Sequence, residues 1–235
     1  MIRTAILVDG GFYRKRASYL WGTVSAEDRA SELNTYCLFH ANEKKSGELH
    51  HLYRIFYYDC EPIGRRSVYH PLTRQNVDFD KTNTYTWTVE FLEQLKKRRK
   101  FALRLGHLSE QMHYNLKPEV TKALCSGKRT LDSLTEADFQ FNVQQKGVDM
   151  KIGVDIASLS YKKQVDQIVL ISGDSDFVPA AKLARREGID FVLDPMGSNI
   201  RGDLFEHIDG LQSYWKKMSS KYHKARSNPP PVQSL

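Results

Sequence analysis

Acidic residues crowd the end of one apolar segment of this chain. The segment Ile168–Phe177 reads IVLISGDSDF, so an apolar, β-branched run stops abruptly at Asp174 and Asp176. A carboxylate beside the buried layer of a parallel sheet is costly unless something compensates its charge. A second apolar run ends at Asp9, and Asp149 opens an apolar helical pattern shortly before Ile168. These four aspartates are therefore the first candidates for chemistry.

Four converging carboxylates favour a divalent cation. Like charges at short range raise one another's pKa strongly, so the four cannot all stay ionised without a positive partner. Oxygen ligands without histidine or cysteine suit Mg²⁺ or Mn²⁺. Such an ion lowers the pKa of a bound water and polarises a phosphoryl oxygen. The pattern predicts metal-assisted hydrolysis of a phosphodiester, with catalytic and metal-binding roles for Asp9, Asp149, Asp174 and Asp176.

Each aspartate also has a plain structural alternative. Asp176 precedes a helix with Pro179 in its first turn, so it could be an N-cap, and Asp149 could cap its own helix in the same way. Asp9 stands before two glycines and could be a turn residue. Asp174 is the hardest to explain structurally, because Ser-Gly-Asp-Ser-Asp is more polar than a turn requires.

Hydrophobic periodicity predicts an α/β domain that would position these residues. The expected strands are Thr4–Val8, Leu52–Tyr58, Phe101–Leu108, Gln167–Ser172 and Ile189–Leu193. The expected helices are Phe12–Trp21, Ser25–Lys45, Trp87–Arg99, Val148–Lys162 and Asp176–Glu187, the last closed by Gly188. This order predicts three layers: a mostly parallel central sheet with helices on both faces.

The carboxyl edge of such a sheet is where ligands collect. Asp9, Asp174 and Asp176 follow strands and should project there. The helix from Asp149 and the strand after it each cover about 20 Å, so Asp149 should lie level with Asp174. Asp155 lies about 240° around that helix from Asp149 and about 9 Å deeper, so it could support the metal ligands but is the weaker candidate for binding the metal itself.

Two stretches lack periodicity and predict irregular insertions, near residues 59–86 and 109–138. Between the second insertion and the helix from Val148, Phe139–Gln145 alternates and predicts a half-exposed strand at a sheet edge. We expect one domain over residues 1–210, followed by a basic, proline-containing tail over 211–235. Its last part, Ser227–Leu235, is expected to be disordered.

Composition indicates an ordinary globular protein with an anionic partner. The chain has 235 residues, a formal net charge of +7 and a pI near 9.2. Its three cysteines form no CxxC pair, which argues against a disulfide framework or a zinc ribbon. No apolar run reaches the roughly 20 residues that span a bilayer. We therefore expect a cytoplasmic protein with no membrane partner.

Three motifs resemble the NYN domain, and more narrowly its LabA-like (DUF88) branch within the PIN-like nuclease fold. They are DGGFYRKR from Asp9, QQKGVDMKIGVDIA over Gln144–Ala157 and LISGDSDF over Leu170–Phe177. The resemblance covers the chain from about Ile2 to Asp209. It implies a PIN-like fold and a metal-dependent ribonuclease site formed by the four aspartates, with Ser172 beside the metal or the attacking water. Phe12 stands where the family often has asparagine.

A phosphodiester substrate also needs cations around the acidic centre. Arg14, just beyond Asp9, and Lys151, two residues after Asp149, are near enough to contact or position it, although either could be part of a solvated face. The first insertion carries Arg65 and Arg66 together with aromatic residues, a mixture that suits single-stranded nucleic acid.

Two functions remain open at this point. The first is an RNA-cleaving enzyme that uses Mg²⁺ or Mn²⁺ and acts on single-stranded RNA. The alternative is a non-catalytic RNA-binding or regulatory interaction module on the same scaffold, which Phe12 favours because it removes a polar contact to substrate or metal-bound water. The chain is also compatible with homo-oligomers.

Overall fold

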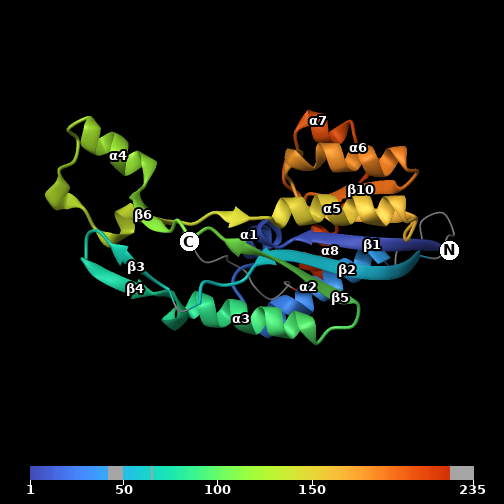
Figure 1. Ribbon diagram of the computed structural model, residues 1–235, viewed down its shortest axis with the longest axis horizontal. Coiled ribbons are helices and arrows are strands. Elements are labelled where there is room, and N and C mark those ends of the chain that lie inside the picture. Colours follow the sequence, from blue (N-terminus) through green and yellow to red (C-terminus); the bar gives the residue numbers. More distant parts are fainter. Residues whose placement is uncertain (42–49, 65, 223–235) are drawn as a thin grey trace.

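A seven-stranded sheet forms the centre of the molecule in the computed structural model, which describes residues 1–41, 50–64 and 66–222 (Figure 1). Its order is β11 (Gly210–Leu211), β10 (Asp190–Asp194), β9 (Gln167–Ile171), β1 (Ile2–Asp9), β2 (His50–Cys60), β5 (Phe101–Leu108) and β8 (Gln145–Lys146). All neighbours run parallel except β8, which is antiparallel to β5. The predicted mostly parallel α/β sheet is confirmed.

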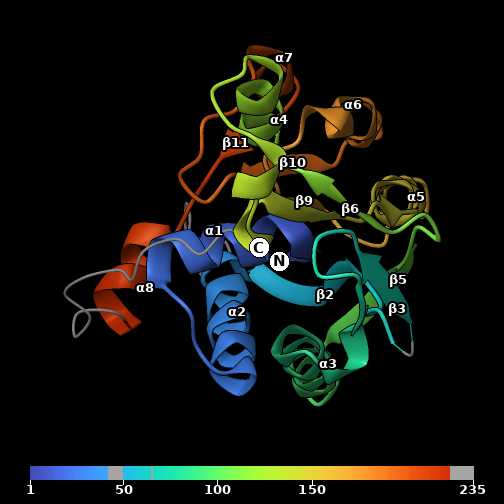
Figure 2. The ribbon, with the colours of Figure 1, turned by 90° about the vertical axis from the view of Figure 1, so that its left-hand side faces the viewer.

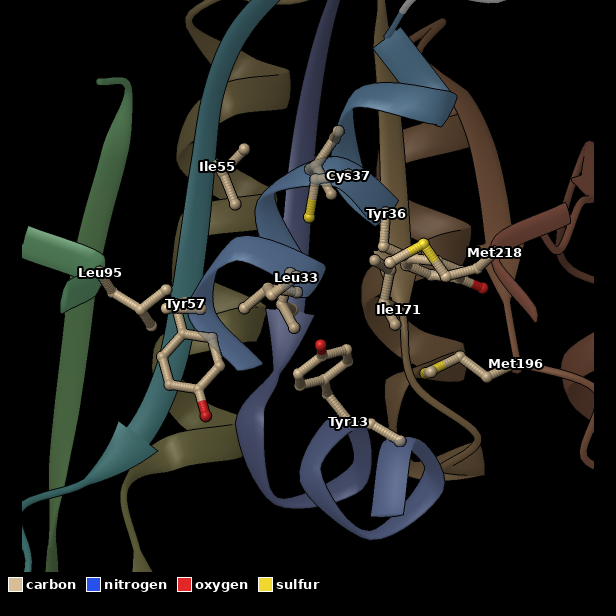
Figure 3. Packing of buried hydrophobic residues seen from close by; sticks show 14 of the residues in the cluster. Tyr13, Leu33, Tyr36, Cys37, Ile55, Tyr57, Leu95, Ile171, Met196 and Met218 are labelled. Carbon is tan, nitrogen blue, oxygen red and sulfur yellow. The ribbon is translucent and has the colours of Figure 1, made fainter. Parts of the chain in front are cut away.

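The sheet buries both of its faces. In β1 the side chains of Ile6 and Val8 enter one core, and those of Ala5 and Leu7 enter the other, as the twofold period of a strand requires. The first core is covered by α1 (Gly10–Trp21), α2 (Ala26–Ala41), α3 (Asn83–Lys96) and α8 (Trp215–Tyr222). The second is covered by α5 (Val148–Tyr161), α6 (Val178–Arg186) and α7 (Gly202–Phe205) (Figure 2). Figure 3 shows side chains of the first core.

The two segments predicted to be irregular, near residues 59–86 and 109–138, contain regular elements. They hold β3 (Ser67–His70), β4 (Gln75–Asp78), β6 (His113–Leu116), α4 (Pro118–Cys125) and the 3-10 turns η1 (Phe79–Lys81), η2 (Leu131–Ser133) and η3 (Glu136–Asp138), and β7 (Phe139–Asn142) follows directly. These elements, residues 66–81 and 113–142, form one lobe beside the sheet, which we call the arm (Figure 1). Ring contacts hold it together, with centroids 4.4 Å apart for His70 and Tyr114 and for Phe79 and Phe141.

Two of the expected elements are divided differently in the structure, and one expected boundary lies outside the described residues. The predicted edge strand Phe139–Gln145 is two strands: β7 pairs with β6 inside the arm, and only β8 lies at the sheet edge. The helix expected to start at Asp176 begins as the 3-10 turn η4 (Ser175–Phe177), and its Gly188 adopts φ +77°, as a C′ glycine does. Residues 42–45 of the helix expected to end at Lys45 lie outside the described part of the chain.

The fold continues into the segment predicted as a tail. Helix α8 lies within it, and its Met218 is fully buried in the first core (Figure 3). The expectation for Ser227–Leu235 falls outside the described residues. Across the described ranges, the helices fall short of the length and apolarity that a membrane span needs.

Alanine substitutions at the two glycines after Asp9 should have different effects on stability. A Cβ at Gly10 would lie 2.5 Å from the carbonyl oxygen of Tyr58, whereas a Cβ at Gly11 would meet no atom closer than 3.5 Å. Because a backbone carbonyl cannot move aside as a flexible side chain can, Gly10→Ala should lower the free energy of unfolding by about 1–3 kcal/mol. Gly11→Ala should cost nothing and could gain up to about 1 kcal/mol from helix propensity. Urea denaturation of both variants measures this, and equal stabilities would contradict the close packing of α1 on β2.

Candidate active site

Four strands of the parallel sheet end at or near an aspartate. Asp9 is the last residue of β1, Asp194 is the last of β10, and Asp59 is the next to last of β2. Asp174 follows the end of β9 by three residues. The register pairs Asp9 with Tyr58 and Asp194 with Ile171, so these carboxylates share one edge of the sheet.

An open cavity of about 620 Å³ lies at this edge. Asp9, Asp149 and Asp174 all line it, so residues from β1, α5 and the loop after β9 come together. Its other lining residues are Gly11, Phe12, Lys15, Gln145, Ser172, Gly173, Ser175, Ser198, Asn199 and Arg201. Asp176 is solvent-exposed and stands outside this lining.

Asp9 is held by two hydrogen bonds. Its Oδ1 accepts from the backbone N–H of Phe12 at 3.1 Å, which caps α1, and its Oδ2 accepts from Ser172 Oγ at 3.2 Å. Burial raises the pKa of Asp9, the two hydrogen bonds lower it, and the charges of Asp149 and Asp59 raise it again, so that the balance is a raised pKa. Asp9 therefore caps a helix, and its burial makes the ionised form less favourable than it is in water.

Asp149 has no capping role. The N-cap of α5 is Gly147, at φ +80°, so Asp149 lies inside the first helical turn and the capping alternative is wrong. Among the described residues no hydrogen bond reaches its carboxylate. The pKa of Asp149 is raised, first by burial and then by the charges of Asp174 and Asp176. The negative charges of Asp174 and Asp176 thus act on the Asp149 carboxyl group.

Asp174, rather than Asp176, provides the local cap. Its Oδ1 accepts from the backbone N–H of Asp176 at 3.0 Å and so caps η4, while its own N–H donates to Ser172 Oγ at 3.3 Å. The N-cap of α6 is Phe177, which has no capping side chain, so the proposed capping role of Asp176 is wrong. The Ser172 hydroxyl thus links Asp9 to the loop that carries Asp174.

Asp59 was missed by the sequence reasoning. It is 1% exposed, and its carboxylate accepts from Arg14 Nη2 at 3.0 Å, Tyr57 Oη at 2.9 Å and the backbone N–H of Cys60 at 2.8 Å. The run LYRIFYY that precedes it could have revealed it by the same rule that selected Asp9. Arg14, predicted to contact nucleic acid, is engaged by Asp59 and does not line the cavity.

The remaining predicted residues lie apart from the cavity. Asp155 accepts from Tyr58 Oη at 2.8 Å and Arg104 Nε at 2.9 Å, which ties α5 to the sheet. Lys151 is exposed on α5 outside the cavity lining. Arg66 lines a different cavity, of about 430 Å³, on and beside the arm. Arg65 lies outside the described residues.

Two cations in the cavity wall were not singled out from the sequence. Lys15 comes from α1, and Arg201 from the loop before α7, where it also pairs with Asp203 at 3.2 Å. Lys15 belongs to the basic run Arg14-Lys15-Arg16, which was a signal, but only the structure shows which of the three faces the aspartates. The cavity therefore combines carboxylates with positive charge suited to a phosphate.

The donor set fits a hard cation, although it is not a closed cage. No group of three or more histidine, cysteine, aspartate or glutamate side chains is clustered tightly enough to hold a metal anywhere in the described ranges. Mg²⁺ usually keeps several waters and takes only one or two carboxylates together with substrate phosphates. Three oxygen-bearing side chains around one open cavity satisfy that requirement.

One family model matches part of the chain. The family model described as NYN domain matches residues 89–199, a span that includes Asp149, Ser172, Asp174 and Asp176 but not Asp9. The NYN domain is a PIN-like nuclease family. No curated protein matches the chain. A solved structure of a protein of unknown function from Vibrio parahaemolyticus is 15% identical with a TM-score of 0.44, covering 90% of this chain and 92% of that chain.

Removing the charge of Asp9 should stabilise the protein. Asn keeps an acceptor for Phe12 N–H, and the raised pKa means that the folded state binds the Asp9 proton more readily than the unfolded state does. The ionised carboxylate therefore costs stability above its unfolded pKa. We expect Asp9→Asn to match or exceed wild type at pH 7, with a gain that shrinks as the pH falls through the folded pKa of Asp9 towards its unfolded value.

Urea denaturation between pH 7 and pH 4 measures this difference. Asp155→Asn is the matched control, because it removes a carboxylate that is paired with Arg104 and should lower stability at pH 7. A larger loss of stability at neutral pH for Asp9→Asn than for Asp155→Asn would contradict the account.

Proposed function

We propose that this chain is a metal-dependent ribonuclease that hydrolyses RNA phosphodiester bonds in the cavity at the carboxyl edge of the sheet. The observation that carries the proposal is the shared cavity of Asp9, Asp149 and Asp174. Neighbouring carboxylates contribute to the raised pKa of Asp9 and of Asp149. The NYN match over residues 89–199 supports the same reaction class.

The charged residues of the cavity and Ser172 each have a role in this proposal. Asp9, Asp149 and Asp174 hold Mg²⁺ or Mn²⁺, and Asp176 adds negative charge from just outside the lining. The bound ion supplies a water of lowered pKa and stabilises charge on the phosphoryl oxygens. Ser172 fixes the orientation of the Asp9 carboxylate through its hydroxyl. Lys15 and Arg201 neutralise the phosphates of the substrate from the cavity wall.

The finer assignments belong to the same proposal. We assign the chain to the LabA-like (DUF88) branch, with a three-layer PIN-like domain over residues 1–210 to which α8 of the basic segment 211–235 adds, working in the cytoplasm on single-stranded RNA. Lys151 and Asp155 support the site from α5. Arg66 contacts RNA at the arm, where it and the half-exposed Tyr69 line one cavity. Arg65, outside the described residues, keeps its predicted role in binding RNA. Arg14 assists by holding Asp59.

A non-catalytic RNA-binding module is the second candidate. Phe12 favours it, because its apolar ring lines the cavity where the family often has an amide. The absence of a tight group of three metal ligands among the described residues points the same way. This module would bind RNA through Lys15 and Arg201 without cleaving it, and its binding would not depend on a divalent cation.

Asp174→Asn should separate the two candidates. The change keeps an acceptor for the backbone N–H of Asp176 but removes one metal-binding charge. We expect cleavage of single-stranded RNA to fall at least about a hundredfold, with wild-type activity lost in EDTA and restored by Mn²⁺. The measurement is the initial rate on a labelled oligonucleotide, with Asp28→Asn, an exposed aspartate of α2, as the control that retains full activity. Equal rates for wild type and Asp174→Asn would refute the hydrolytic function.

A further inference from the structure

Helix α1 carries an unusual set of side chains on its outer face. Phe12, Lys15, Arg16 and Tyr19 are spaced i, i+3, i+4 and i+7, so they form one stripe along the helix. The opposite face holds the buried residues Gly10, Tyr13, Ala17 and Trp21. Aromatic residues normally mark the buried face of a helix, yet the Tyr19 side chain is 65% exposed. The fold gives no packing reason for this ring.

The stripe begins inside the candidate active site. Phe12 and Lys15 both line the cavity that contains Asp9 and Asp174. The Phe12 ring lies against the loop after β9, because a Cβ at Gly173 would be 2.9 Å from its Cε2 atom. Anything bound along the stripe would therefore continue directly into the carboxylate cavity.

The outer half of the stripe is a paired cation and ring. The Arg16 guanidinium lies 5.1 Å from the centroid of Tyr19. Its Nη2 also donates to the backbone oxygen of Met196 at 2.8 Å, which fixes it beside the loop that follows β10. The arrangement is oriented before any ligand arrives, and it leaves one face of an aromatic ring available to solvent.

Helix α8 extends the same kind of surface. It lies beside α1, where Trp21 Nε1 donates to Ser219 Oγ at 3.0 Å (Figure 2). Its Trp215 packs on the same loop that Arg16 contacts, since a Cβ at Gly197 would be 2.4 Å from Trp215 Nε1. Lys216 lies 5.5 Å from the Trp215 ring, and no acidic residue follows Gly210 in the sequence. Positive charge and aromatic rings therefore meet around this loop.

We propose that the stripe of α1 binds the single-stranded RNA segment that flanks the bond in the cavity, an inference that rests on the proposed ribonuclease function. Rings that stack on bases and cations that track the backbone are the combination used for single strands. From Phe12 to Tyr19 the helix rises about 10 Å, the length of about three base steps of 3.4 Å. An anionic peptide would use the charges but would give the exposed ring no stacking partner.

Binding of a labelled oligouridylate to the full chain in EDTA tests the proposal, because no cleavage occurs and the readout does not require the hydrolytic function. Tyr19→Ala should weaken binding at least about fivefold, whereas Tyr19→Phe should bind like wild type. Lys15→Gln should reduce the slope of log affinity against log salt by about 0.7. The controls are Tyr161→Ala, a tyrosine 58% exposed at the far end of α5, and Lys162→Gln beside it; both should bind like wild type.

The outcomes separate this proposal from the proposed function. Equal RNA affinities of Tyr19→Ala and Tyr161→Ala would overturn RNA binding by the stripe of α1, even if the chain cleaves RNA. Equal weakening by Tyr19→Ala of binding to oligouridylate and to inorganic polyphosphate, which has no bases, would also overturn it. If binding of oligouridylate depends on Tyr19 but the chain cleaves no RNA with Mn²⁺, RNA binding by the stripe is supported and the hydrolytic function is refuted.

Discussion

The crowding of carboxylates at one edge of the sheet is the constraint on which the rest of the structure depends. Parallel strands bring their carboxyl ends together, and in this chain four of them carry an aspartate there. Asp59 and Asp194 are buried and fully compensated; Asp194 accepts from Tyr36 Oη at 2.6 Å, His40 Nε2 at 2.8 Å and Met196 N–H at 2.8 Å. Asp9, Asp149 and Asp174 face an open cavity instead.

The two buried aspartates, Asp59 and Asp194, help to position the helix that borders the cavity. Asp59 holds Arg14 of α1, whose first turn is capped by Asp9. Asp194 holds the backbone of Met196, to which Arg16 of the same helix binds. These contacts fix helix α1 beside the cavity, so that the half-buried Phe12 and the exposed Lys15 line it and Tyr19 lies exposed on the same side of the helix. The fold pairs these two buried carboxylates with polar partners, whereas Asp9, Asp149 and Asp174 line the open cavity.

Long periodic segments made the sheet and the shared edge of Asp9, Asp149 and Asp174 predictable from the sequence, because each buried run repeats its pattern over several turns or residue pairs. The arm was not predictable, because its strands are four residues long and its rings, such as His70 and Tyr114, pair across two distant insertions. Asp174 caps a helical turn, whereas Asp176 was the expected cap. Residue propensities do not distinguish two aspartates that lie two positions apart. Arg201 reaches the cavity only through the tertiary path of the chain.

The proposed function depends on a divalent cation bound by the carboxylates of this edge. Anomalous diffraction from crystals soaked in MnCl₂ tests this binding, since the signal locates manganese independently of activity. We expect an anomalous peak in the cavity, within coordination distance of carboxylate oxygens from Asp9, Asp149 or Asp174. A fully occupied manganese peak elsewhere, with none in this cavity, would contradict it.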